Sequence, residues 1–339
     1  GQLRQARDLL QELAGRPLAD GDQRVRALVA RARVERLLGR PSDGYALLAP
    51  RLDEPAGPRA RLALAAEAAV TGVLCGTADA ARHARHLDRL AAEADDPVLG
   101  TTAAVVQSFV AAHTDCGLRV DDTLDRAGSE VDALADADLA RHPDLLALLG
   151  WAEYLHERER CALHHFDRAL EVCCRAGLVA LIPWLLIGRC AVTGRLGNLE
   201  RALVEGEDAE EVAVAMGVDP LVGLARAYRA IAVAWRSGPA AARQLAETAL
   251  LDAAGRRANW YDGLSQRVTT RLRYLAGDRA GAASALRRAC GGDDLDQVEL
   301  SSRPCWASAL AEMSHKAGRR EEAARWLEVA ERYAGQGRL

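Results

Sequence analysis

The sequence predicts an all-α superhelical solenoid, a curved stack of antiparallel helix pairs. Two observations predict this fold. Half of the residues are hydrophobic but only 4% are aromatic, and the apolar residues are mostly Ala and Leu, which favour helices over strands. In addition, one set of small residues and turn residues recurs about every 40 residues, as expected when a helical unit is repeated along the chain.

The clearest repeated marker is a pair of alanines. The first alanine recurs at intervals of 40 or 41 residues, at Ala162, Ala202, Ala242, Ala282 and Ala323. The second follows seven residues later, at Ala169, Ala209, Ala249, Ala289 and Ala330. Seven residues make about two helical turns, so both alanines lie on one face, where small side chains let two helices approach closely. We therefore expect each pair to mark the second helix of a unit.

Other markers delimit the first helix of each unit. A proline lies 19 residues before the first alanine in three units, at Pro143, Pro183 and Pro304. Proline suits the first turn of a helix, because the N–H that it lacks has no partner there. A turn residue lies five residues before the first alanine, at Gly197, Ser237, Gly277 and Gly318. Such residues let a helix end and the chain reverse, so each unit is predicted to be helix, tight turn, helix and loop.

The N-terminal part carries weaker markers. Gly39 with Gly44 and Gly76 with Ala81 show the five-residue offset, whereas residues 98–140 are helical in pattern without clear markers. We therefore predict degenerate helical repeats over residues 1–140 and regular, tetratricopeptide-like repeats of about 40 residues over 141–339, joined in one continuous solenoid. This organisation gives seven or eight units and about 14–16 helices, with the segments 52–58 and 291–294 as the most mobile connectors.

Composition narrows the class of protein. The net charge of −4 and the pI near 6.1 argue against a nucleic-acid-binding surface, which is usually basic. No apolar run is long enough to span a membrane, and the N-terminus shows no signal-peptide pattern. Eight cysteines without a C-x-x-C pair indicate reduced, mostly buried thiols and a cytoplasmic location. The chain also begins inside a helical pattern without Met, so we expect a fragment of a longer protein.

Residues 143–176 resemble a tetratricopeptide repeat. The resemblance depends on a Leu-Gly pair ending at Gly150, an alanine twelve residues later (Ala162), an aromatic residue four further on (Phe166) and Ala169 after three more. With the turn that contains Gly197, Leu199 and Ala202, this unit is similar to the sensor region of the large ATP-binding LuxR-type transcriptional regulators of actinobacteria, which include the maltose-regulon activators.

The resemblance implies a multidomain regulator. Such proteins have an N-terminal nucleotide-binding module, a helical-repeat sensor and a C-terminal helix-turn-helix, and the sensor controls oligomerisation and transcription activation. This sequence has no G-x-x-x-x-G-K-[ST] loop, because its single lysine is Lys316. It ends in Arg325–Ala330, which completes a repeat rather than a recognition helix. We therefore expect no cofactor and no direct nucleic-acid binding in this part.

The concave face of such a solenoid, lined by the first helix of each unit, is the expected binding site. Placed in the alanine register, seven side chains fall on that face: Trp151, Tyr154, Trp184, Arg195, Arg267, Arg271 and Tyr274. The same register adds Trp235, Glu312 and His315. Flat aromatic side chains with a few arginines suit an amphipathic small molecule or a peptide. The alternative is that the tryptophans pack between helices, as is common in repeat proteins.

Several residue groups raise the question of hidden chemistry. Cys161 with His164 and His165, and His83 with His86, have the residue types of zinc ligands, but neither group supplies four ligands. Cys161, Cys173, Cys174 and Cys190 suggest a redox pair, although small core fillers explain them as well. The arginines between Arg24 and Arg40 and the carboxylate pairs fit solvated helix faces. Neither G-x-S-x-G nor H-E-x-x-H occurs, so the sequence does not predict an enzyme.

Two functional hypotheses remain open at this point. In the first, the chain is the sensor of a regulator and binds a small-molecule effector or a protein partner, with self-association as a possible output. In the second, it is a protein–protein scaffold that holds a peptide or a helix in its groove. A closed aromatic pocket favours the small molecule, whereas an open channel with spaced polar groups favours the peptide. A helical enzyme, the third class, would need converging carboxylates or histidines.

Overall fold

The computed structural model describes residues 2–14, 21–251 and 259–336. The first half contains α1 (Gln2–Ala14), α2 (Gly21–Leu37), α3 (Pro41–Leu48), α4 (Pro58–Leu74), α5 (Asp79–Arg85), α6 (Leu87–Ala94), α7 (Pro97–His113), α8 (Val120–Ala133) and α9 (Asp136–Arg141). The second half contains α10 (Asp144–Leu155), α11 (Glu159–Ala176), α12 (Ile182–Arg195), α13 (Leu199–Met216), α14 (Asp219–Ser237), α15 (Pro239–Leu251), α16 (Trp260–Leu275), α17 (Ala282–Ala289), α18 (Arg303–Lys316) and α19 (Arg320–Gln336). Short 3-10 turns are η1 (Ala49–Arg51), η2 (Val179–Leu181), η3 (Gly292–Asp294) and η4 (Leu300–Ser302).

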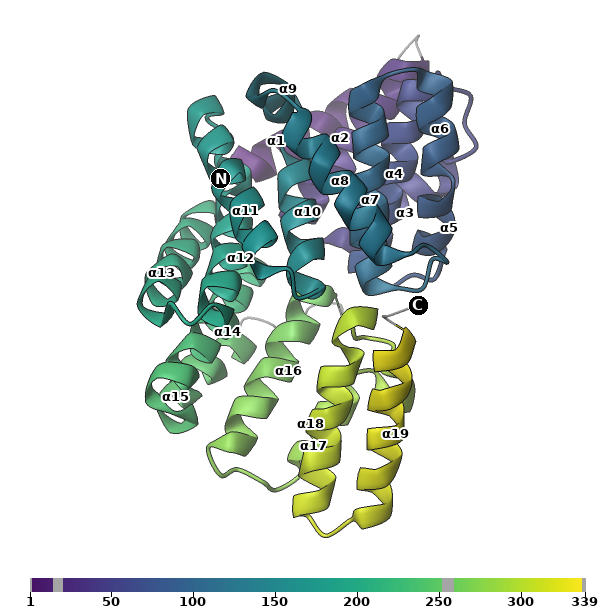
Figure 1. Ribbon diagram of the computed structural model, residues 1–339. Helices are drawn as coiled ribbons and strands as arrows, with labels where there is room; N and C mark the ends of the chain where they lie inside the picture. The colour runs from purple at the N-terminus through teal and green to yellow at the C-terminus, as the bar shows by residue number, and fades with distance from the viewer. Residues whose placement is uncertain (1, 15–20, 252–258, 337–339) are drawn as a thin grey trace.

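These helices form an all-α solenoid of antiparallel pairs, which confirms the predicted fold class. Eight successive pairs can be followed: α2/α3, α4 with the broken helix α5–α6, α7/α8, α10/α11, α12/α13, α14/α15, α16/α17 and α18/α19. The 19 α-helices in the described part exceed the expected 14–16, because α5–α6 is interrupted and α1 and α9 lie outside the pairs. Figure 1 shows α16 between the α14/α15 pair and the group α17–α19.

The alanine register proves to be the packing register. Ala162, Ala202 and Ala242 each lie in the first turn of a second helix and are fully buried. The turn residues Gly197 and Gly318 adopt φ of 84° and 79°, a left-handed conformation that glycine adopts without strain. Around α13 and α14, which have 18 and 19 residues, the helices absorb the long spacing. Between α17, which has 8 residues, and α18, the connecting segment with η3 and η4 absorbs it instead.

The inner helices α10 and α12 approach α11 closely, and two glycines make this possible. A Cβ on Gly150 would lie 2.8 Å from a ring carbon of Phe166, and a Cβ on Gly188 would overlap the same ring. The ring cannot move aside, because Phe166 is fully buried and packs against Trp151 with their ring centroids 5.9 Å apart. The Leu-Gly marker of the sequence is therefore a contact of the core.

Buried contacts also cross residue 140. The largest core extends from Leu38 to Leu272, and a second core extends from Tyr274 to Ala330. The Arg36 side chain is buried between two carboxylates: its Nε donates to Glu67 at 2.8 Å and its Nη2 donates to Asp144 at 3.0 Å. The division into 1–140 and 141–339 stays a prediction, but α2, α4 and α10 share this ion network.

The two predicted connectors, 52–58 and 291–294, are short links between helices. The segment 291–294 contains the turn η3, where Arg287 pairs with Asp293 at 2.7 Å, and the segment 52–58 links η1 to α4. Within the described ranges, no helix is both long and apolar enough to cross a membrane.

Gly188→Ala should lower the free energy of unfolding by about 1–3 kcal/mol, because the new methyl group overpacks the Phe166 site. Gly100→Ala is the matched control: it also lies inside a helix, α7, but its Cβ would meet no atom within 4 Å, so the substitution should stabilise the protein by about 0.5–1 kcal/mol. Urea unfolding of both variants gives the two values. Similar effects of both substitutions would contradict the packing described above.

The free energy of unfolding should decrease as the pH is lowered below neutrality. Burial lowers the pKa of His156, which follows α10, to about 4, whereas a free histidine titrates near 6.5. Protonation therefore favours the unfolded chain, so the contribution of His156 is complete above pH 6.5 and is lost as the pH falls toward 4. We expect a loss on the order of 2 kcal/mol.

Urea unfolding at several pH values measures how steeply the free energy of unfolding depends on pH. This slope should be smaller for His156→Gln, while His86→Gln, at an exposed position, keeps the wild-type slope. An unchanged slope in His156→Gln would argue against this assignment.

Candidate functional site

A cavity of about 560 Å³ opens on the inner side of the solenoid, and we call it the groove. Its walls come from the first helix of successive pairs, α10, α12, α14, α16 and α18, together with η4. Its aromatic side chains are Tyr154, Tyr228, Trp235, Trp260 and Trp306. Its aliphatic side chains are Leu155, Ala191, Ile231, Ala232, Leu264, Val268, Leu272, Leu275 and Ala309.

The first three inner helices reach the groove with their C-terminal ends. The groove contacts the last residues of α10 at Tyr154, the segment 190–195 of α12 and the segment 228–235 of α14. Beside the groove, α10, α12 and α16 pack aromatic side chains against one another through Trp151, Trp184 and Trp260. The groove therefore lies among the inner helices, and a binding site on the concave face stays a prediction.

An aromatic cluster lies behind the groove, with Trp151 at its centre. The Trp151 ring is 4.8 Å from Trp184, 5.7 Å from Trp260 and 5.9 Å from Tyr228, measured between centroids. Trp151 and Trp184 are only 1% and 5% exposed, and neither lines the groove. The structure thus corrects the expectation that these two tryptophans face a ligand, and favours the alternative of packing between helices.

Charged side chains lie on two opposite sides of the groove. On α12, the Arg195 guanidinium lies 4.1 Å above the Tyr154 ring and donates to the Tyr154 carbonyl oxygen at 3.0 Å. On the α16 and α18 side, Arg271 pairs with Glu312, which also accepts from Lys316 Nζ at 2.7 Å. The hydrogen bond from Lys316, and then that from Arg271, lowers the pKa of Glu312. Nη1 of Arg271 is buried and has no hydrogen-bond partner.

Arg267 and Tyr274, the last two predicted site residues, are buried in the protein core. Arg267 is completely buried: its Nη2 pairs with Glu299 at 2.9 Å and its Nη1 donates to the Gln297 carbonyl oxygen at 2.6 Å. Tyr274 is 5% exposed and belongs to the second core. The prediction of ligand-facing side chains is therefore corrected for these two as well, whereas Tyr154, Arg195 and Arg271 do line the groove.

Sequence reasoning missed Tyr228, Trp260 and Trp306, which all line the groove. None of the three falls at a position that the alanine register assigned to the inward face. The rarity of these residues was the available signal, because the chain has only six tryptophans and six tyrosines, and five of these twelve side chains line the groove. Trp235 and Glu312, which the register did indicate, also line it.

The cysteines do not resemble a redox centre. Burial raises the pKa of Cys173 to about 11 and that of Cys190 to about 12, whereas a reactive thiol has a lowered pKa. All eight cysteines are free; Cys116, Cys173, Cys190 and Cys290 are buried, while Cys161, Cys174 and Cys305 are exposed. His83 is buried and lies 3.3 Å from the Tyr45 hydroxyl, whereas His86 is exposed.

One of the similar known structures shares this fold, with a TM-score above 0.5. A Rap protein complexed with competence and sporulation factor is 10% identical, with a TM-score of 0.60, over 93% of this chain and 99% of that chain. The apo form of RapI is 10% identical, with a TM-score of 0.47, over 99% of this chain and 98% of that chain. A signal-transduction ATPase with a tetratricopeptide repeat sensor, from Pyrococcus horikoshii, is 13% identical, with a TM-score of 0.47, over 84% of this chain and 43% of that chain.

Comparison of the sequence with known families and proteins does not assign the chain to a family. No family model matches the chain, and no match to a curated protein is found. The chain has the tetratricopeptide-like, all-α solenoid fold, with a groove formed by its inner helices.

Proposed function

We propose that this chain is the non-catalytic sensing region of a larger cytoplasmic transcriptional regulator, and that it binds an amphipathic effector in the groove. The observation that carries this proposal is the groove itself. Its volume of about 560 Å³ lies in the range typical of small-ligand sites, about 300–1,000 Å³, which are mostly apolar with a few placed polar groups. The aromatic lining favours the small-molecule hypothesis over an open peptide channel.

The polar groups of the groove suggest the chemistry of the effector. Arg195 and Arg271 supply positive charge on two sides, and Nη1 of Arg271 is a buried donor without a partner. An unsatisfied buried donor costs about 1–3 kcal/mol, which a ligand acceptor beside it would recover. We therefore propose an effector with an apolar or aromatic body and at least one carboxylate or similar acceptor.

The position of the groove suggests how binding is transmitted. Helix α16 contributes Leu272 to the first core and Tyr274 to the second, and Trp306 packs against both cores. A ligand that touches α12 and α14 on one side and α18 on the other favours one spacing of the two cores. It thereby shifts the population of solenoid curvatures by its differential affinity, which in a regulator would bias oligomerisation. No proton or group transfer is needed in this scheme.

A peptide partner is the second candidate, and one observation favours it. Trp235 and Leu275, at the mouth of the groove, are 55% and 43% exposed, and the neighbouring Leu196 is 44% exposed. These apolar side chains continue the groove beyond the cavity, as an extended ligand would require. The similar Rap protein was crystallised with competence and sporulation factor, which supports binding on this fold by analogy.

The test is a thermal-shift screen with Trp fluorescence, using aromatic and fatty carboxylic acids, nucleotides and short peptides. A ligand at 100 times its Kd should stabilise the folded protein by about 2.7 kcal/mol. Arg195→Gln should weaken a carboxylate ligand about 10-fold or more, because a hydrogen bond to a charged group is lost. Trp235→Ala should weaken an extended ligand. The controls are Arg236→Gln and Leu327→Ala, exposed positions outside the groove.

Thiol labelling gives an independent readout of the same site. Cys305 is exposed and lines the groove, whereas Cys174 is exposed on α11 outside it. A bound effector should slow the alkylation of Cys305 and leave that of Cys174 unchanged. Ligands that stabilise the protein without protecting Cys305, and without sensitivity to the groove variants, would refute the proposed site. Hits confined to peptides would favour the second candidate.

A further inference from the structure

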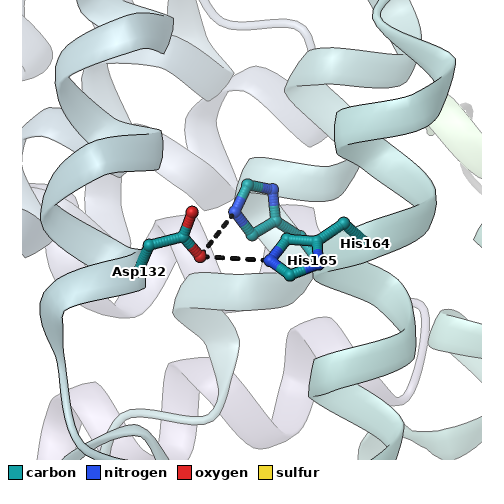
Figure 2. Close-up of side chains that lie close together, drawn as sticks. All are labelled: Asp132, His164 and His165. Atoms are coloured by element: carbon teal, nitrogen blue, oxygen red, sulfur yellow. Dashed lines mark hydrogen bonds and ion pairs between the residues drawn. The ribbon is translucent and has the colours of Figure 1, made fainter.

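A second constellation of polar side chains lies away from the groove, where α8 packs near α11. Nε2 of His164 lies 3.2 Å from Oδ1 of Asp132, and Nε2 of His165 lies 3.6 Å from the same oxygen (Figure 2). One ligand atom from each of the three residues lies within 4.8 Å of the other two. We propose that Asp132, His164 and His165 bind a divalent transition-metal ion, with zinc as the best match.

His165 is oriented as a metal ligand. Its Nδ1 lies 2.7 Å from Oε2 of Glu153, on α10, and both side chains are almost fully buried. A carboxylate at that position accepts the Nδ1 proton and leaves Nε2 with its lone pair free. Nε2 is buried, points toward Asp132 and has no hydrogen-bond partner (Figure 2). An imidazole held by a carboxylate on its other nitrogen is the usual surrounding of a zinc-bound histidine.

The donor set favours zinc over the commoner hard cations. Two imidazole nitrogens and one carboxylate oxygen suit Zn²⁺, whereas Ca²⁺ and Mg²⁺ prefer oxygen ligands. With Zn–N and Zn–O bonds of about 2.0–2.1 Å, tetrahedral ligand atoms lie about 3.3–3.4 Å apart. The distances of 3.2 and 3.6 Å to Asp132 Oδ1 are close to this value. His164 and Asp132 are 58% and 50% exposed, so water can reach the fourth position.

Two neighbours bear on this assignment. Cys161, which the sequence grouped with the two histidines, is exposed and does not belong to the close set; Asp132 replaces it. Nη1 of Arg168 lies 3.5 Å from Oδ1 of Asp132 and reduces the attraction for a cation. Most of the hydrogen bonds of Arg168 go elsewhere, to the Val131 and Leu134 carbonyl oxygens and to Asp136, so Asp132 remains available.

A metal ion at this place would join two parts of the solenoid. Asp132 lies near the end of α8, the second helix of its pair, whereas both histidines lie on α11, the second helix of the next pair. The ion would fix these outer helices to each other, and Glu153 would connect it to the inner helix α10. Since a ligand that binds only the folded state stabilises it, zinc should raise the midpoint of thermal unfolding.

The experiment uses the complete chain, without an affinity tag and with its thiols kept reduced. Zn²⁺ binding is measured by calorimetry, and Co²⁺ binding by visible absorption. We expect one ion per chain and tetrahedral Co²⁺ bands without a thiolate charge-transfer band. Asp132→Asn and His164→Ala, both at exposed positions, should each weaken binding about 10-fold or more and leave the midpoint of the metal-free protein unchanged. His86→Ala, at an exposed histidine elsewhere, is the control and should bind as the wild type does.

Three results would overturn the proposal. The first is the absence of Zn²⁺ binding at micromolar concentrations, which would make the constellation a plain hydrogen bond between Asp132 and His164. The second is full affinity in both variants. The third is a thiolate band that disappears in Cys161→Ser, which would assign the bound ion to a cysteine site. None of these measurements depends on the effector of the groove.

Discussion

The packing of Trp151 is the interaction on which the rest of the structure depends. In an open solenoid each unit contacts only its neighbours. Here the Trp151 ring, on α10, contacts Trp184 on α12, Tyr228 on α14 and Trp260 on α16. A single side chain thus joins four inner helices, so the stack must curve tightly. The groove lies beside this cluster, since Tyr228 and Trp260 line it while Trp151 does not.

Polar contacts likewise connect the N-terminal helices with distant parts of the chain. Arg36 on α2 donates to Asp144 at the start of α10, a contact between residues 108 positions apart in the sequence. The Ser301 hydroxyl, in η4, donates to the Ala112 carbonyl oxygen on α7, across 189 positions. A buried charge is costly unless it is paired, so Arg36 requires that both Glu67 and Asp144 be in place. These contacts join α2 to α10 and η4 to α7.

The sequence was informative wherever a local rule determines the structure. The spacing of Ala162, Ala202 and Ala242 predicts the second helices, because small residues are needed wherever two helices meet at each repeat. Gly197 and Gly318 end first helices because their backbone is left-handed. The same register placed Tyr154, Arg195 and Arg271 on the concave side, where the groove is.

The sequence was uninformative wherever the curvature of the whole stack determines whether a side chain is buried or lines the groove. Trp151 and Arg271 occupy equivalent positions in their units, yet one is buried under α16 and the other lines the groove. No periodic pattern within one unit records which helix lies three units away. The same reason conceals the metal constellation, since Asp132 belongs to a region without markers and approaches His164 and His165 only after α8 has packed beside α11.

The contact between Trp151 and Trp260 has a kinetic consequence. A linear array can form from any unit and grow by adding neighbours, so its folding involves mainly short loops. This chain must bring α10 and α16 together across the intervening pairs, and loop closure of that length slows folding. During synthesis the rings of Trp151 and Trp184 emerge before Trp260 does. Until α16 leaves the ribosome they lack the surface that buries them, and the nascent chain carries an apolar patch that the finished protein does not expose.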